Sequence, residues 1–320
     1  MYDQSDIKAI FNKTQNNHHT NLGPMVTVNY KGRLGNNMIQ YIAAYMLAKK
    51  HNLRLNAQPS HDCGNDTPAK DYPFYDKLIH ASLKDFQINS NWGEYFKFPL
   101  YSGGTDGRSN GRVNISGRSE IPNTPYINLL ESKNLAPKHY HLDGFFQDSR
   151  LLYKYRDEIK DLFTLEYDDK IKPSEVFVAY RIGDISGFRH MLPKEYYIEA
   201  LNLIKPSGGY ITSDTIDHPF VVELMEEYNL KPYISNHPLK VMDFAKNFNN
   251  LIVSGGSFNF WLAFLSKAQN IIINDRPWKW FGKTLFDFPT WRRLSWDYED
   301  NTFDTNYRLT SYKPIKLINN

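Results

Sequence analysis

Three short turns that carry polar side chains or glycines follow apolar runs in the second half of the chain. They are "RIGD" (181–184), "SD" (213–214) and "SGGS" (254–257). Guanidinium groups, hydroxyls and the backbone N–H groups of glycine turns are the groups with which proteins bind phosphate. The three turns therefore predict a site for a phosphate-bearing ligand.

A fourth turn of this kind lies near the start of the chain. "GRLGNN" (32–37) follows a short β-branched run and leads into an amphipathic stretch. Glycines at this spacing either reverse the chain or hold backbone N–H groups open toward a ligand. The turn contains Arg33, Gly35 and Asn36. Asn36 is an N-cap candidate for the helix that follows, a role compatible with a ligand contact.

The common nucleotide and metal motifs are absent from the chain. No G-x-G-x-x-G fingerprint occurs, which argues against NAD or FAD. "GKT" (282–284) has Pro277 where a P-loop needs its first glycine. Neither H-E-x-x-H nor Asp-x-Asp occurs, and the latter is the usual manganese-binding pair of metal-dependent glycosyl transfer. We therefore expect a metal-free site built from arginine, backbone N–H groups and hydroxyls.

Composition excludes several other classes of protein. The 320 residues are 41% hydrophobic and 23% charged, typical of a globular protein, and they carry a net charge of only +3 without long runs of like charge. A nucleic-acid-binding surface is therefore not expected. The single cysteine, Cys63, excludes an intramolecular disulfide and a multi-cysteine metal site. No apolar stretch indicates a secretory signal or a spanning helix, so we expect a cytoplasmic protein.

The elements that must position the turns alternate between strands and helices. Such alternation predicts parallel sheets covered by helices, with the ligand beyond the carboxyl ends of the strands. We expect an α/β fold of two Rossmann-like domains that face a cleft, 1–150 and 151–320, with an irregular region over 58–125. The expected strands are 26–28, 53–57, 175–180, 209–214, 250–256 and 270–275. One helix is expected directly after the turn at 32–37, and the others are expected at 193–204, 218–229, 240–247 and 257–268.

Six segments, in order, resemble the α-1,2-fucosyltransferase family, and the first is also similar to the glycine loop of protein O-fucosyltransferases. The family patterns are G-x-LGNQMFQYA, GY(W/F)QS, H-x-R-x-GD, LP-x-EYY, IFSDD and NS(S/T)FSWW. The matching segments here are "GRLGNNMIQYIAAYMLA" (32–48), "LDGFFQDSRLL" (142–152), "VAYRIGD" (178–184), "MLPKEYYIEAL" (191–201), "YITSD" (210–214) and "GGSFNFWLAFLSKAQNIII" (255–273).

The resemblance implies a GT-B fold and a metal-independent, inverting transfer of a sugar, usually fucose from GDP-fucose, to a glycan hydroxyl. It implies catalytic roles for Arg181, which would hold the donor diphosphate, and for Asn36, which would face the cleft. No cofactor is implied other than the nucleotide-sugar donor. The candidate donor-binding residues are Arg33, Gly35, Asp184, Ser213, Asp214, Gly256, Ser257 and Phe258.

Simpler structural roles remain open for several of these residues. Arg181 could form a salt bridge with Asp184, which would then orient the arginine or cap its turn. Asp214 could cap a helix instead of contacting the nucleotide. No general base is assigned, although Asp71, Asp76 and Asp143 are carboxylates of the first domain that could reach the cleft.

The chain also departs from the family pattern. Ala179 stands where the family has histidine, Gly255 and Gly256 replace an Asn-Ser pair, and Asn37 replaces glutamine. These departures leave two alternatives open. The fold could use another nucleotide-linked sugar, such as a UDP sugar, or the protein could be a non-catalytic relative that binds glycans or nucleotides.

Overall fold

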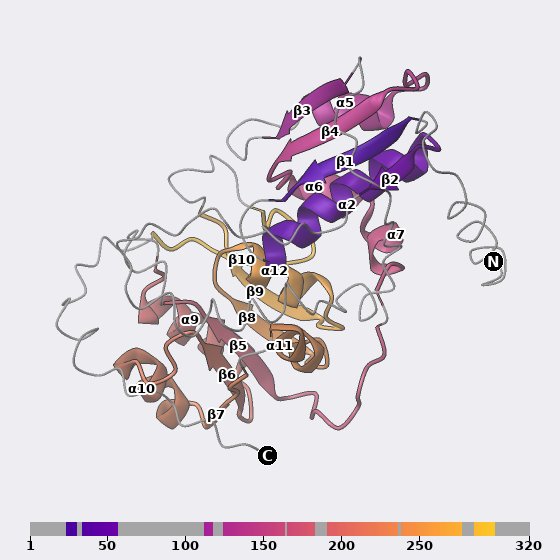
Figure 1. Ribbon diagram of the computed structural model, residues 1–320. Helices are drawn as coiled ribbons and strands as arrows, with labels where there is room; N and C mark the ends of the chain where they lie inside the picture. The colour runs from indigo at the N-terminus through magenta and orange to yellow at the C-terminus, as the bar shows by residue number, and fades with distance from the viewer. Residues whose placement is uncertain are drawn as a thin grey trace.

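The structure, a computed structural model, describes part of the chain in detail. The described residues are 24–30, 34–56, 112–117, 124–163, 165–182, 191–235, 238–276 and 285–297. Within these ranges the fold is α/β with two separate parallel sheets, as the sequence predicts (Figure 1). No helix of the described ranges is both long and apolar enough to cross a membrane.

The first sheet has four strands in the order β2-β1-β4-β3, and every pair is parallel. In the register of β1 with β4, Asn29 lies opposite Asp143 at the carboxyl edge of the sheet. Helices α2 and α5 pack against this sheet. The elements are β1 (Met25–Asn29), α2 (Leu34–Lys50), β2 (Arg54–Asn56), β3 (Arg112–Gly117), α5 (Thr124–Glu131), β4 (His139–Gly144), α6 (Ser149–Lys154) and α7 (Arg156–Lys160).

The second sheet has six parallel strands in the order β10-β9-β8-β5-β6-β7. Its central strands are buried on both faces, which explains their unbroken apolar sequences. The elements are β5 (Val176–Tyr180), α9 (Lys194–Ile204), β6 (Gly209–Ser213), α10 (Pro219–Glu227), β7 (Leu230–Pro232), α11 (Pro238–Ala245), β8 (Asn250–Val253), α12 (Ser257–Phe264), β9 (Asn270–Asn274) and β10 (Arg292–Leu294).

Side chains of β5 alternate between two hydrophobic cores. Phe177 and Ala179 belong to the core that contains α11 and α12, whereas Val176, Val178 and Tyr180 belong to the core beneath α9 and α10. This period of two is what a strand inside a covered sheet requires. The first of these cores continues into α2 and β1, so a single hydrophobic cluster joins the two sheets.

Helix α2 is buried on almost every side. Of its 17 residues, only a few near its ends and at Tyr45 are not buried, because the helix lies between the first sheet, α5 and α12. The sequence suggested an amphipathic helix, but a helix enclosed on all sides has no need of a polar face. Figure 1 shows α2 and α12 at the place where the two sheets meet.

The closest approach between α2 and α12 is at Gly35. A Cβ atom at this position would lie 2.5 Å from the backbone nitrogen of Phe258 and 2.6 Å from the carbonyl carbon of Ser257. The indole Nε1 of Trp261 donates a hydrogen bond to the carbonyl oxygen of Gly35 over 2.9 Å. Only glycine permits this contact, because both neighbouring atoms are backbone and cannot rotate away.

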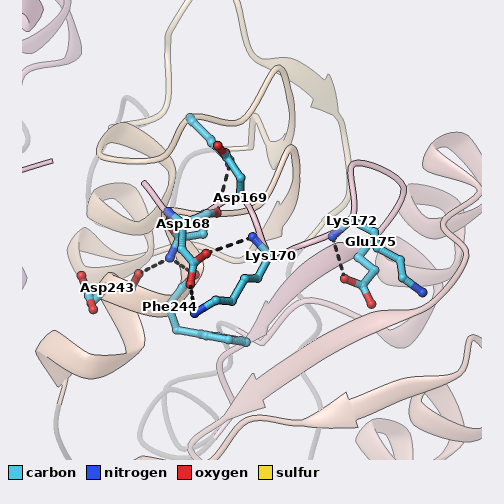
Figure 2. A network of polar contacts seen from close by, with 9 residues as sticks. Asp168, Asp169, Lys170, Lys172, Glu175, Asp243 and Phe244 are labelled. Atoms are coloured by element: carbon cyan, nitrogen blue, oxygen red, sulfur yellow. Dashed lines mark hydrogen bonds and ion pairs between the residues drawn. The ribbon is translucent and has the colours of Figure 1, made fainter. Parts of the chain in front are cut away.

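The chain between α7 and β5 is fixed to the amino end of the second sheet. The Asn247 amide, just after α11, accepts a hydrogen bond from the backbone N–H of Asp168 and donates to the carbonyl oxygens of Asp243 and Phe244. Lys267 bonds to Asp169 over 2.9 Å. Figure 2 shows these contacts beside the turn around Lys170.

The same segment is also held just before β5 begins. The Asn250 amide, at the start of β8, donates to the carbonyl oxygens of Pro173 and Glu175. The Glu175 carboxylate in turn accepts from the backbone N–H of Lys172 (Figure 2). The chain therefore enters β5 from a fixed end, and residue 181 emerges at the opposite, carboxyl edge of the sheet.

The sequence-based elements of the second half are confirmed, with ends that differ by a few residues. In the region expected to be irregular, the structure places β3 at Arg112–Gly117. Short elements that the sequence analysis did not name are β4, α5, α6, α7, β7 and β10.

Gly35→Ala is expected to lower stability by about 1–3 kcal/mol, because the added methyl group must push α12 away from α2. A glycine-to-alanine change within an ordinary helix would instead stabilise it by roughly 0.5–1 kcal/mol. Urea unfolding of the variant and the wild type measures the difference. An unchanged or higher midpoint would show that the two helices do not meet as closely as described.

The stability is also expected to depend on His218, the N-cap of α10, which is 2% exposed. Burial lowers the pKa of His218 to about 4, against smaller opposing effects of Asp217 and Glu223. Its Nδ1 accepts a hydrogen bond from the backbone N–H of Phe220. Protonation of Nδ1 would remove this acceptor. Because the unfolded chain binds this proton more readily, the contribution of His218 is lost as pH falls from about 6.5 toward 4.

His218→Asn supplies a matched comparison, since asparagine is a good N-cap residue and does not titrate. Unfolding free energies of both proteins at pH 7 and pH 4.5 give the test. The wild type should lose more stability than the variant between these two values. Equal losses would exclude His218 as the cause.

Candidate functional site

Five of the candidate residues lie together at the start of α12: Gly35, Arg181, Gly256, Ser257 and Phe258. Arg181 follows β5, whose neighbours in the sheet are β8 and β6, so it emerges beside the turns that follow those two strands. Its side chain is half-buried. A Cβ atom at Gly256 would lie only 2.4 Å from Nη1 of Arg181. The guanidinium group therefore rests directly on the turn that begins α12.

Gly256 is the N-cap residue of α12 and has φ +104° and ψ 153°. This backbone conformation is almost restricted to glycine. The structure thus gives a physical reason for glycine at position 256. A side chain at Gly256 would be strained and would also displace the guanidinium group of Arg181.

Gly35 and Asn36 lie in the first turn of α2, which packs against the first sheet. Gly35 packs against Ser257 and Phe258, the first two residues of α12. Asn36 is next to it and is half-buried, and its Oδ1 accepts a hydrogen bond from Nε2 of Gln147 over 2.7 Å. Since α2 begins at Leu34, Asn36 lies within its first turn, and the predicted role as an N-cap is wrong.

A buried hydrogen-bond network fixes the turn that carries Arg181. The Ser254 hydroxyl donates to the carbonyl oxygen of Ala179 and accepts from the backbone N–H of Arg181, each over 3.1 Å. It also accepts from Nδ2 of Asn259 over 2.7 Å. Asn259 in turn donates to the carbonyl oxygen of Gly255. The ends of β5 and β8 and the first turn of α12 are thereby locked together.

The turn after β6 braces the residue that follows Arg181. The exposed Asp214 accepts from the backbone N–H of Ile182 over 2.8 Å. Ser213 accepts from the backbone N–H of Thr215. Asp214 does not cap α10, because the N-cap of that helix is His218. Both residues lie one strand away from Arg181 on the same edge of the sheet.

Two of the candidate residues, Arg33 and Asp184, lie outside the described residues. Asp71 and Asp76 also lie outside them. The sequence analysis did not single out Gln147, Ser254 or Asn259 as functional. Gln147 lies inside a segment quoted for its family resemblance, and Ser254 lies inside one of the polar turns, so both signals were present.

One carboxylate beside the site has a perturbed pKa. Asp148, the N-cap of α6, is 7% exposed, and this burial acts to raise its pKa. The bidentate hydrogen bonds from Arg150, at 3.1 and 2.7 Å, outweigh burial and hold the pKa below its usual value. Asp148 is therefore an ionised structural carboxylate next to Gln147.

The arrangement places a cation, a glycine turn and a helix N-terminus at one point. The first backbone N–H groups of a helix have no partner inside the helix, and the helix dipole favours an anion there. A guanidinium group beside such a terminus is suited to bind a phosphate or diphosphate. The amide of Asn36, from the other sheet, adds a hydrogen-bonding group at the junction.

Comparisons with known proteins were made for the whole chain. No protein-family model matches it. The O-antigen biosynthesis glycosyltransferase WbnK of Escherichia coli is 23% identical over 305 residues, which cover 82% of this chain and 98% of WbnK. Among solved structures, a mutant of Arabidopsis thaliana FUT1 in complex with GDP is 12% identical, with a TM-score of 0.42, and the match covers 87% of this chain and 76% of FUT1.

A second solved structure is NodZ alpha-1,6-fucosyltransferase soaked with GDP-fucose. It is 10% identical with a TM-score of 0.39, and the match covers 78% of this chain and 94% of NodZ. Both TM-scores lie below 0.5.

Removal of the Ser254 hydroxyl is expected to loosen the Arg181 turn. In Ser254→Ala the backbone N–H of Arg181 loses its acceptor, which costs about 1–3 kcal/mol of stability. Ser266→Ala is a matched control, since Ser266 is also buried and bonds to the backbone, but at the other end of α12. Hydrogen exchange of the Arg181 amide should be at least about tenfold faster in Ser254→Ala only. Equal protection in both variants would refute the network's role.

Proposed function

We propose that this protein is a glycosyltransferase that transfers fucose from GDP-fucose to a hydroxyl group of an oligosaccharide, without a metal ion and with inversion at the anomeric carbon. The observation that carries the proposal is the position of the Arg181 guanidinium group at the start of α12, where Gly35, the neighbour of Asn36 in α2, also packs. The similarity to WbnK, which is described as an O-antigen biosynthesis glycosyltransferase, supports the general reaction. The choice of donor rests on the resemblance of the six sequence segments to fucosyltransferases.

In the proposed reaction the acceptor hydroxyl oxygen attacks the anomeric carbon of the donor. The bond from this carbon to the β-phosphate oxygen breaks, and its electron pair leaves with GDP. Negative charge grows on the leaving phosphate, so fixed positive groups there lower the barrier. The acceptor's proton passes to the released diphosphate, which accords with the absence of an assigned base.

Arg181 is the residue proposed to stabilise the leaving diphosphate. Ser254 holds the backbone of Arg181 and Asp214 holds that of Ile182, which supports a guanidinium group that is in place before the donor binds. A preorganised charge costs no rearrangement during the reaction. The N-terminus of α12 adds backbone N–H groups beside the same phosphates.

Arg181→Ala is expected to lower the rate of transfer by about 10²–10³-fold, because it removes the main positive charge from the leaving group. Arg292→Ala is the matched control, since Arg292 is exposed at the amino end of β10. Transfer is measured as GDP released from GDP-fucose in the presence of an oligosaccharide acceptor and a chelator. A normal rate in Arg181→Ala, or loss of the rate on chelation alone, would contradict the proposed mechanism.

The donor is tested by thermal unfolding with GDP, UDP, CDP, ADP and their sugar conjugates. A ligand at 100 times its dissociation constant adds about 2.7 kcal/mol, or roughly 5–10 °C for a chain of this size. A shift with guanine nucleotides, absent in Arg181→Ala, is expected. A shift only with UDP compounds would change the donor. Binding of a nucleotide sugar without hydrolysis or transfer would favour a non-catalytic binding protein.

A further inference from the structure

Gln147 is the one side chain of the loop after β4 that makes a described hydrogen bond to a candidate catalytic residue. Its Nε2 donates to Oδ1 of Asn36 over 2.7 Å. Both side chains are half-buried, and they come from segments 111 residues apart in the sequence. The contact therefore depends on the fold of the first sheet rather than on local sequence.

The residue before Gln147 is held in a strained conformation. Phe146 has φ +52°, which is a rare value for a bulky residue. Its ring is fully buried and meets Tyr126 edge-on, with 5.2 Å between the ring centres. Its carbonyl oxygen accepts a hydrogen bond from the backbone N–H of Asp148 over 2.9 Å. Such strain persists only where the surroundings impose it, and it often occurs at functional sites.

The residue after Gln147 is fixed as well. The buried carboxylate of Asp148 accepts from the backbone N–H of Arg150 and holds the guanidinium group of Arg150. Gln147 is thus placed between a buried aromatic anchor and a buried helix cap. Its backbone has little freedom, and its side chain is presented to Asn36.

The backbone next to Asn36 is fixed by the contacts of its neighbour, Gly35. Gly35 accepts a hydrogen bond from Trp261 and packs against Ser257 and Phe258 at the start of α12. The backbone around Asn36 is therefore fixed, and the remaining freedom is the direction of its side-chain amide. A carboxamide has an oxygen that accepts and an NH2 group that donates.

We propose that Gln147 is a positioning residue that orients the Asn36 amide, so that the oxygen faces Gln147 and the NH2 group faces the substrate. The proposal rests on the proposed glycosyltransferase function of this site. Asn36 then donates a hydrogen bond to a substrate oxygen, on the diphosphate or on the acceptor, and does not act as a base. Gln147 need not touch either substrate.

Two substitutions separate this role from a merely structural one. Gln147→Met keeps the size of the side chain and removes the hydrogen bond. Gln147→Glu keeps a hydrogen bond, but an ionised carboxylate only accepts, so Asn36 must reverse its amide and present its oxygen to the substrate. The exposed Gln269, at the amino end of the second sheet, gives the matched control Gln269→Ala.

Both Gln147 variants are expected to lower kcat by about 10–100-fold, since a misplaced contact to the reacting atoms costs this much. Their unfolding midpoints should stay near that of the wild type, and the activity of Gln269→Ala should stay near the wild-type activity. In Asn36→Ala the further change Gln147→Met should have no added effect on kcat. Full activity of Gln147→Glu, or independent effects in the double variant, would overturn the proposal.

A second measurement detects the orientation of the Asn36 side-chain amide in the absence of turnover. In protein labelled with ¹⁵N, the side-chain NH2 signal of Asn36 should shift when GDP is added, and this shift should vanish in Gln147→Glu. An equal shift in both proteins would overturn the proposed orientation. Failure of the wild type to transfer sugar from any nucleotide donor would instead overturn the proposed function, so the two failures are distinguishable.

Discussion

The contact between α2 and α12 is the constraint on which the rest of the structure depends. At Gly35 the two helices meet backbone to backbone, and Trp261 closes the contact with a hydrogen bond. The hydrophobic core then runs without a break from the first sheet to α11 and α12. Because both helices begin at this contact, their first turns are held side by side. Gly35, which precedes Asn36, and Gly256, which lies against the Arg181 guanidinium group, are thereby brought together at the start of α12.

The site itself is rigid because buried polar groups are paired. The Ser254 hydroxyl makes three hydrogen bonds, and each of them joins a different part of the edge where Arg181 emerges. Loss of these partners would leave a buried hydroxyl without hydrogen bonds and would lower the stability of the protein. The network therefore favours a single arrangement. Rigidity of this kind suits the role proposed for Arg181, which is to hold positive charge where a leaving group departs.

The sequence predicts the second sheet well because its strands are continuous apolar runs, such as Val176–Tyr180, between helices with clear ends. It predicts β4 poorly, since His139–Gly144 has no β-branched residue and contains two histidines and an aspartate. Arg181 could be located from its place after a strand, but the bonds of Ser254 and Gln147 join residues that are far apart in the chain. The domain boundary near 150 and the cleft stay predictions, as do the roles of Arg33 and Asp184.

The glycine at position 35 also limits how this chain can be recombined. A hybrid enzyme made by joining the first half of one transferase to the second half of another would bring together an α2 and an α12 that had not evolved as a pair. Any side chain at position 35, or any shift of residues 257–258, would then separate the two halves at the point where they form the site. Exchange of loops around a retained pair of helices therefore disturbs this contact less than exchange of whole halves.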